Sequence, residues 1–301
     1  TTSYKAWAER LAGYAQSDKV HHEAEYWLNL PMHRAARLPQ DFLGSTNTEG
    51  SARRIALSLS TEETRALLQD VPPVYGTEIN DVLLTALAQT ICRWTGSSAL
   101  LADVEGHGRV ALFDDVDLSR TVGWFTTVYP VLLELPDGRP GEALQAVKAQ
   151  LRQIPGQGLS YGLARYLADD ADLVQRLQAL PSAGVLFNYL GQFDQSLARS
   201  DMMSLSAMSA GAERSPQAQR SHLLQVTSYV SGGRLHVEWT YSQTLHHWQT
   251  IQHLAQSYLE ALRTLIIHCR NRDALTHKAD AFPQAHLSQE ELDAILAELA
   301  E

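Results

Sequence analysis

The segment from Asp103 to Arg109 reads DVEGHGR and contains two side chains that can move protons, Glu105 and His107. A glycine follows each of them, so the backbone can adopt unusual dihedral angles and approach a neighbouring group closely. A carboxylate enclosed by backbone can acquire a raised pKa and act as a general base. From the spacing alone, a structural salt bridge between Glu105 and Arg109 is the favoured interpretation, and His107 is expected to be a hydrogen-bonded loop residue.

A second group of polar residues lies in FNYLGQFD, from Phe187 to Asp194, where Asn188 and Tyr189 stand near the end of a strand-like run. They form either a sheet edge with a hydrogen-bonded tyrosine or a polar pair that faces a cleft. The segment PGQGLSYG, residues 155–162, lacks the Gly-Lys-Ser/Thr ending of a phosphate-binding loop, so we expect a tight turn that enters a helix.

Two histidine pairs, at 21–22 and 246–247, have no third ligand at metal-binding spacing. We expect surface or capping roles for both pairs and predict no metal site. The chain contains no GxSxG nucleophile motif.

The elements that must position these residues are helices on a mixed sheet, which predicts an α/β fold. Ser60 and Glu63 form a capping box, and Asn80 is the expected cap of the next helix. Glycines 232 and 233 predict a β-hairpin. Further helices are expected around residues 144–154 and 251–265, and strands at 53–60, 98–104, 121–135, 184–190, 223–230 and 234–241.

The composition excludes several classes of protein. The 301 residues include 24 Lys and Arg against 34 Asp and Glu, a net charge of −10, which argues against nucleic-acid binding. No apolar run approaches the roughly 18 residues of a membrane span, and no signal peptide opens the chain, so we expect no membrane contact and a cytoplasmic location. Cys92 and Cys269 are expected to be buried free thiols.

Five segments together carry a family resemblance. They are NDVLLTAL, VEGHGR, SRTVGWFTTVYP, PGQGLSYG and VLFNYLGQFD, in this order between residues 80 and 194. In content and order they resemble the epimerization domains of nonribosomal peptide synthetases, members of the condensation-domain superfamily. The resemblance implies the two-lobed chloramphenicol acetyltransferase-like fold, here mainly the C-terminal lobe with a mixed sheet flanked by long helices.

The resemblance also implies a reaction, which is L-to-D epimerization at Cα of an aminoacyl or peptidyl thioester. The substrate would hang on the 4′-phosphopantetheine of a peptidyl carrier domain, and the domain would need no cofactor or metal of its own. By motif match Glu105 is the catalytic acid/base, Asn188 and Tyr189 are positioning residues or proton donors, and His107 holds the loop. The alternatives are a condensation domain that forms amide bonds, and a non-catalytic domain that docks carriers.

One departure from the family concerns its HHxxxDG motif, which supplies a catalytic histidine. In VHHEAEYW the positions of Asp and Gly hold Tyr26 and Trp27, so this segment is not that motif. The chain also opens without methionine, as though cut from a longer polypeptide. We therefore expect residues 1–50 to be a helical tail of the N-terminal lobe and residues 51–280 to be the C-terminal lobe. Residues 281–301 would form a linker and a short acidic helix, opened by a capping box at Ser288 and Glu291. The missing N-terminal lobe and a downstream condensation domain are further expected partners.

Overall fold

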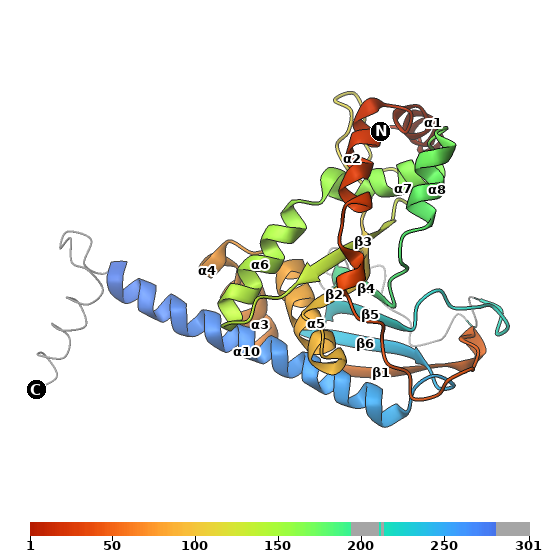
Figure 1. The fold of residues 1–301 in the computed structure, drawn as a ribbon. Helices are drawn as coiled ribbons and strands as arrows, with labels where there is room; N and C mark the ends of the chain where they lie inside the picture. The colour runs from red at the N-terminus through yellow and green to blue at the C-terminus, as the bar shows by residue number, and fades with distance from the viewer. Residues whose placement is uncertain (194–210, 212–213, 281–301) are drawn as a thin grey trace, which may run out of the picture.

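A six-stranded mixed sheet forms the centre of the chain, as the ribbon in Figure 1 shows. The structure, a computed structural model, describes residues 1–193, 211 and 214–280. The spatial strand order is β1-β6-β5-β4-β2-β3, in which β4 is parallel to both β2 and β5 and the other pairs are antiparallel. The strands are β1 (Ala52–Ser58), β2 (Ala99–Gly106), β3 (Thr127–Glu134), β4 (Val185–Gln192), β5 (Leu224–Ser231) and β6 (Arg234–Ser242).

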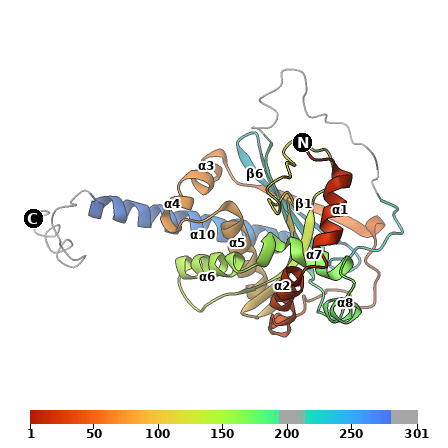
Figure 2. The same ribbon diagram turned by 90° about the horizontal axis from the view of Figure 1, so that it is seen from above.

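Helices cover both faces of the sheet, which confirms the predicted α/β class. Figures 1 and 2 show α10 and α5 along one face, while α1, α2, α7 and α8 gather together away from α10. Short 3₁₀ turns lie at Met32–Arg34, Glu49–Ser51 and Pro155–Gly158. The helices are α1 (Tyr4–Tyr14), α2 (Asp18–Leu28), α3 (Thr61–Gln69), α4 (Pro72–Tyr75), α5 (Ile79–Thr95), α6 (Pro140–Arg152), α7 (Leu159–Tyr166), α8 (Ala171–Gln178) and α10 (Trp248–Asp280).

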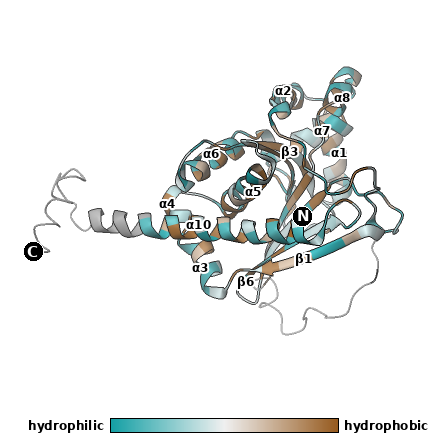
Figure 3. Cartoon of the chain, turned by 60° about the horizontal axis from the view of Figure 1, so that its bottom comes forward, coloured by the Kyte–Doolittle hydropathy of each residue, from teal (hydrophilic) through white to brown (hydrophobic). Residues whose placement is uncertain are grey.

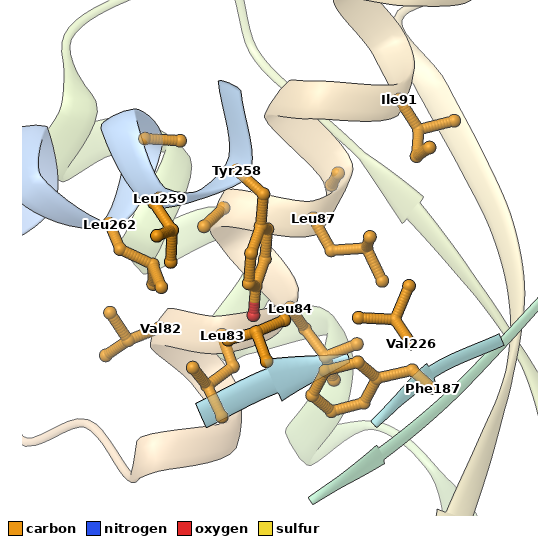
Figure 4. Close-up of a cluster of buried hydrophobic side chains, with 14 of the residues drawn as sticks. Val82, Leu83, Leu84, Leu87, Ile91, Phe187, Val226, Tyr258, Leu259 and Leu262 are labelled. Carbon is orange, nitrogen blue, oxygen red and sulfur yellow. The ribbon is translucent and has the colours of Figure 1, made fainter. Parts of the chain in front are cut away.

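The main hydrophobic core lies between the sheet and α5 with α10. Leu83, Leu87 and Ile91 of α5 are buried there, together with Phe187 of β4 and Tyr258 of α10 (Figure 4). Coloured by hydropathy (Figure 3), the coloured part of α10 carries both brown and teal residues, as expected for a helix that buries one side. None of the helices in the described residues is long and apolar enough to cross a membrane.

A second cluster covers the other face of the sheet at β2 and β3. It contains Trp7 and Trp27 from the first two helices and Tyr161 from α7. The Trp27 indole donates a 3.1 Å hydrogen bond to the Pro130 carbonyl of β3, and its ring centroid lies 5.2 Å from that of Tyr161. Residues 4–28 therefore pack firmly on the rest of the chain.

Strand β2 shows how alternation assigns its residues to the two faces. Leu100, Ala102 and Val104 point into the main core, whereas Leu101 packs in the second cluster. Because successive side chains of a strand point to opposite faces, Asp103 and Glu105 share the face of the second cluster.

Several local predictions are confirmed. Ser60 Oγ accepts a 3.2 Å hydrogen bond from the Glu63 amide, and the Glu63 carboxylate accepts one of 2.7 Å from the Ser60 amide, which completes the capping box. Gly232 and Gly233 have positive φ and connect β5 to β6 as a hairpin. Cys92 and Cys269 are both buried.

Three local predictions are wrong. Helix α5 begins at Ile79 with Glu78 as its N-cap, because the Asp81 carboxylate accepts a 2.7 Å hydrogen bond from the Glu78 amide, so Asn80 is not the cap. Strand β3 begins at Thr127, and residues 121–126 form a loop. His246 is fully buried rather than on the surface. The capping box predicted at residues 288–291 lies outside the described residues.

Candidate active site

Glu105 and Asn188 lie side by side on the parallel strands β2 and β4. Val104 is in register with Phe187, which brings the next residue of each strand together on the face opposite the main core. Asn188 Nδ2 donates a hydrogen bond of 2.5 Å to Glu105 Oε2. Both side chains are half-buried, so the amide orients a carboxylate that a substrate can still reach.

The surroundings of Glu105 raise the pKa of its carboxyl group. Burial is the main cause, because it penalises the charged form. The charge of His222, the hydrogen bond from Asn188 and the charge of Arg214 act in the opposite direction and only partly offset the effect of burial. A carboxyl group with a raised pKa exchanges protons more readily near neutral pH, as a general acid or base must.

Arg109 does not form the salt bridge with Glu105 that the spacing suggested. Its guanidinium donates to the carbonyl oxygens of Leu118 and Thr121, the latter at 2.8 Å, and lies 4.0 Å from the ring centroid of Phe125. Arg109 therefore fastens the loop that follows the site. Among the described residues, no salt bridge to Glu105 forms.

The glycines of the motif allow this loop to fold closely. Gly108 has a φ of +66°, and a Cβ placed on it would collide with the Phe125 carbonyl oxygen. A Cβ on Gly106 would lie 2.8 Å from Thr127 Oγ1, on the neighbouring strand. His107 is exposed, and its Nδ1 accepts a 3.0 Å hydrogen bond from the Arg109 amide, so its ring closes a turn within the loop.

Tyr189 lies on the other face of β4. Its ring packs against the main core, and burial raises the pKa of its hydroxyl group. Among the described residues, no hydrogen bond joins Tyr189 to Glu105. Of the three predicted site residues, the structure brings two into contact and separates the third by the thickness of the sheet.

An acidic and a basic residue that the sequence analysis passed over stand beside this pair. His222, just before β5, places Nε2 2.7 Å from Asp103 Oδ2, and its Nδ1 lies 2.9 Å from Ser221 Oγ. The alternation of β2 was a usable signal for Asp103, since it is two residues from Glu105 on one strand. Nothing local in the sequence identifies His222, because the two partners are 119 residues apart.

The turn and a pocket complete this side of the molecule. Residues 155–158 form the expected tight turn, in which Gln157 and the glycines beside it have positive φ, and α7 begins directly after it.

A pocket of about 560 Å³ opens between β3 and α7, with Asp103, Tyr161 and Arg165 in its lining. In the part of the chain that the structure describes, no group of three or more His, Cys, Asp or Glu side chains could hold a metal ion.

A family model for condensation domains matches residues 1–287. The chain belongs to the condensation-domain family. Among solved structures, the epimerization domain from the third module of tyrocidine synthetase B is similar with a TM-score of 0.83 and 33% sequence identity, and the match covers 91% of this chain and 61% of that one. This likeness confirms the fold class expected from the sequence.

The curated relatives of this condensation-family chain are large synthases. A linear gramicidin synthase from Brevibacillus parabrevis is 46% identical over 301 residues, which are 99% of this chain and 4% of that protein. Chondramide synthase from Chondromyces crocatus is 42% identical over 301 residues, 98% of this chain and 8% of that protein. The chain thus spans only a small part of the relatives that it matches.

Proposed function

We propose that this condensation-family chain is the C-terminal portion of an epimerization domain. It would invert the Cα of an aminoacyl or peptidyl thioester carried on the 4′-phosphopantetheine of a peptidyl carrier domain. The observation that carries the proposal is the contact between Glu105 and Asn188. The carboxyl group in this contact is half-buried and has a raised pKa, and among the described residues no arginine or lysine forms a salt bridge with it. The 33% identity to the epimerization domain from the third module of tyrocidine synthetase B supports the same assignment.

The proposed chemistry is a proton transfer on each face of one carbon. On one face the Cα–H bond breaks, the proton passes to the Glu105 carboxylate, and the electron pair enters the thioester as an enolate. Protonation of Cα on the opposite face completes the inversion and restores the thioester. Asn188 holds the Glu105 carboxylate in one orientation. Because the reacting geometry is fixed in advance, this orientation lowers the activation barrier by more than the energy of the hydrogen bond itself.

The second proton-handling group must act from the other side of the substrate. We propose that it comes from an N-terminal lobe that precedes this chain, with residues 1–50 as the tail of that lobe and residues 51–280 as the C-terminal lobe. Tyr189 is assigned a positioning role behind Asn188, since its ring packs against the main core on the reverse of β4.

Deuterium exchange tests this proposal. In the full synthetase polypeptide, the carrier is loaded with an L-aminoacyl thioester in deuterated water, and α-deuterium uptake and chirality are followed. Wild type should take up deuterium and give a D/L mixture. Glu105→Gln should lower the exchange rate at least about 100-fold, the scale of a lost general base, while Glu9→Gln, a matched change at an exposed helix position, should not. Unchanged exchange in Glu105→Gln would refute the proposed role.

Condensation is the second candidate, because the family model that matches the chain is that of condensation domains. It predicts no α-deuterium uptake from a correctly loaded carrier, and a new amide once an acceptor-loaded carrier is added. A chain that only docks carriers would produce neither signal.

A further inference from the structure

Asp103 and His222 form a second polar pair on the same face of the sheet as Glu105. The distance between His222 Nε2 and Asp103 Oδ2 is 2.7 Å, and the two side chains are 13% and 22% exposed. Asp103 precedes Glu105 by two residues on β2, so the two carboxylates point in the same direction. The pair therefore lies directly beside the proposed proton-transfer residue.

The surrounding backbone fixes the position of His222. Asn47, in the segment before β1, donates a 2.9 Å hydrogen bond from Nδ2 to the His222 carbonyl oxygen. The Arg220 amide donates a 2.8 Å hydrogen bond to the Asn47 carbonyl oxygen, so two contacts hold the residues that precede β5. With its backbone fastened and one ring nitrogen on Asp103, the imidazole has one orientation available.

The contacts of the ring suit an imidazolium cation. The Asp103 carboxylate accepts a hydrogen bond from His222 Nε2. Ser221 Oγ lies 2.9 Å from the other ring nitrogen, Nδ1, and a hydroxyl oxygen can accept a hydrogen bond from it. Both ring nitrogens can then carry a proton.

We propose that Asp103 and His222 are a positioning pair that holds a positive charge beside Glu105 and stabilises its ionised carboxylate during α-proton exchange. The inference rests on the proposed epimerization and deepens it, since it assigns a role to two residues outside the Glu105–Asn188 contact. Neither residue of the pair needs to touch the substrate.

The other charges near Glu105 favour this assignment. Burial raises the pKa of Glu105, and the charge of His222 is the largest effect that lowers it, ahead of the Asn188 hydrogen bond and Arg214. Arg214 is 72% exposed and paired with Glu49 at 3.1 Å, so water and salt screen its charge. The pKa of the Tyr161 hydroxyl group on α7 is raised, mainly by burial, and the negative charge of Asp103 also raises it. His222 is thus the least exposed cation acting on Glu105.

The pH dependence of α-deuterium exchange tests the pair in the full synthetase polypeptide with a loaded carrier. His222→Gln removes the charge and retains hydrogen-bonding capacity. Loss of a neighbouring cation raises the pKa of a carboxylate, so the acidic limb of the rate profile should move to higher pH by about one unit. His222→Lys retains a positive charge and should return the limb toward its wild-type position.

His236→Gln is the matched control, since that histidine lies on β6, bonded to the Ser231 carbonyl oxygen and stacked on Tyr229. It should leave the profile where it is. A limb that does not move in a His222→Gln protein of wild-type melting temperature refutes the inference, as does an equal shift in the control. If His222→Gln does not fold, failure of the folded His222→Lys protein to keep a near wild-type limb refutes it. Absence of exchange in the wild type would instead refute the epimerization proposal itself.

Discussion

Replacing Gly108 with alanine should disturb the loop behind the candidate site much more than a glycine replacement elsewhere. Gly108 has a φ of +66°, and an added Cβ would meet the Phe125 carbonyl oxygen. The left-handed conformation alone costs an alanine about 1–2 kcal/mol. The collision adds to this cost. Phe125 belongs to the loop that Arg109 binds, and it can move away from the added Cβ only by leaving its buried position.

The magnitude follows from what Phe125 would lose. Its side chain is 8% exposed, and burying a phenylalanine is worth about 1.5–3 kcal/mol. The Arg109 guanidinium lies 4.0 Å from its ring centroid, a contact worth about 0.5–1 kcal/mol at a partly exposed site. Together with the backbone cost, we expect Gly108→Ala to lower the free energy of unfolding by about 3–6 kcal/mol.

Gly96→Ala isolates the backbone cost. Gly96 ends α5 with a φ of +71°, and a Cβ there would meet no atom within 4 Å. Urea unfolding followed by tryptophan fluorescence should therefore show a loss of only about 1–2 kcal/mol for this variant. If Gly108→Ala proves no more destabilising than Gly96→Ala, the close approach to Phe125 does not hold the loop and the reasoning fails.

Two further predictions concern ion pairs of the fold. Arg152→Ala removes both guanidinium contacts, at 2.9 and 3.0 Å, from the Asp81 carboxylate, which is 1% exposed, so urea unfolding should show a loss of about 3 kcal/mol. Arg34→Ala, which breaks an exposed pair, should cost less than about 1 kcal/mol, and equal losses would contradict the role of burial. The Arg263 hydrogen bond lowers the pKa of Glu63, so this pair stabilises the fold above the ordinary glutamate pKa of about 4.3, and the contribution disappears as the pH falls through the lowered value. Between about pH 5 and pH 3 the urea midpoint of wild type should therefore fall more steeply than that of Glu63→Gln, and parallel curves would contradict this account.

Elements whose signal is local could be predicted from the sequence. The capping box at Ser60, the glycine hairpin at residues 232–233 and the strand at β2 are each specified by neighbouring residues. The α5 cap was misplaced because Asn80 and Asp81 are both good capping residues. The carboxylate of Asp81 reaches back to the Glu78 amide, which starts the helix one residue before Asn80.

Features that depend on distant contacts could not be predicted in the same way. Residues 121–126 are rich in β-branched and aromatic side chains, which is typical of a strand. They form a loop because Arg109 binds the Thr121 carbonyl oxygen and Gly108 allows close contact with Phe125. His246 is buried by packing near Trp94, which its neighbours in the sequence do not indicate.

The candidate site shows the same division between local and distant information. The motif identified Glu105 and Asn188, and the parallel register of β2 and β4 explains why residues 83 positions apart touch. The neighbouring polar residues Asn188 and Tyr189 were predicted to act together, but adjacent residues of a strand point to opposite faces. Two polar residues of the same strand that face one cleft therefore have a spacing of two, as Asp103 and Glu105 have. That spacing places one carboxylate where Asn188 orients it and the other where it binds His222, so a single strand supplies both the proposed base and the residue that anchors its neighbouring cation.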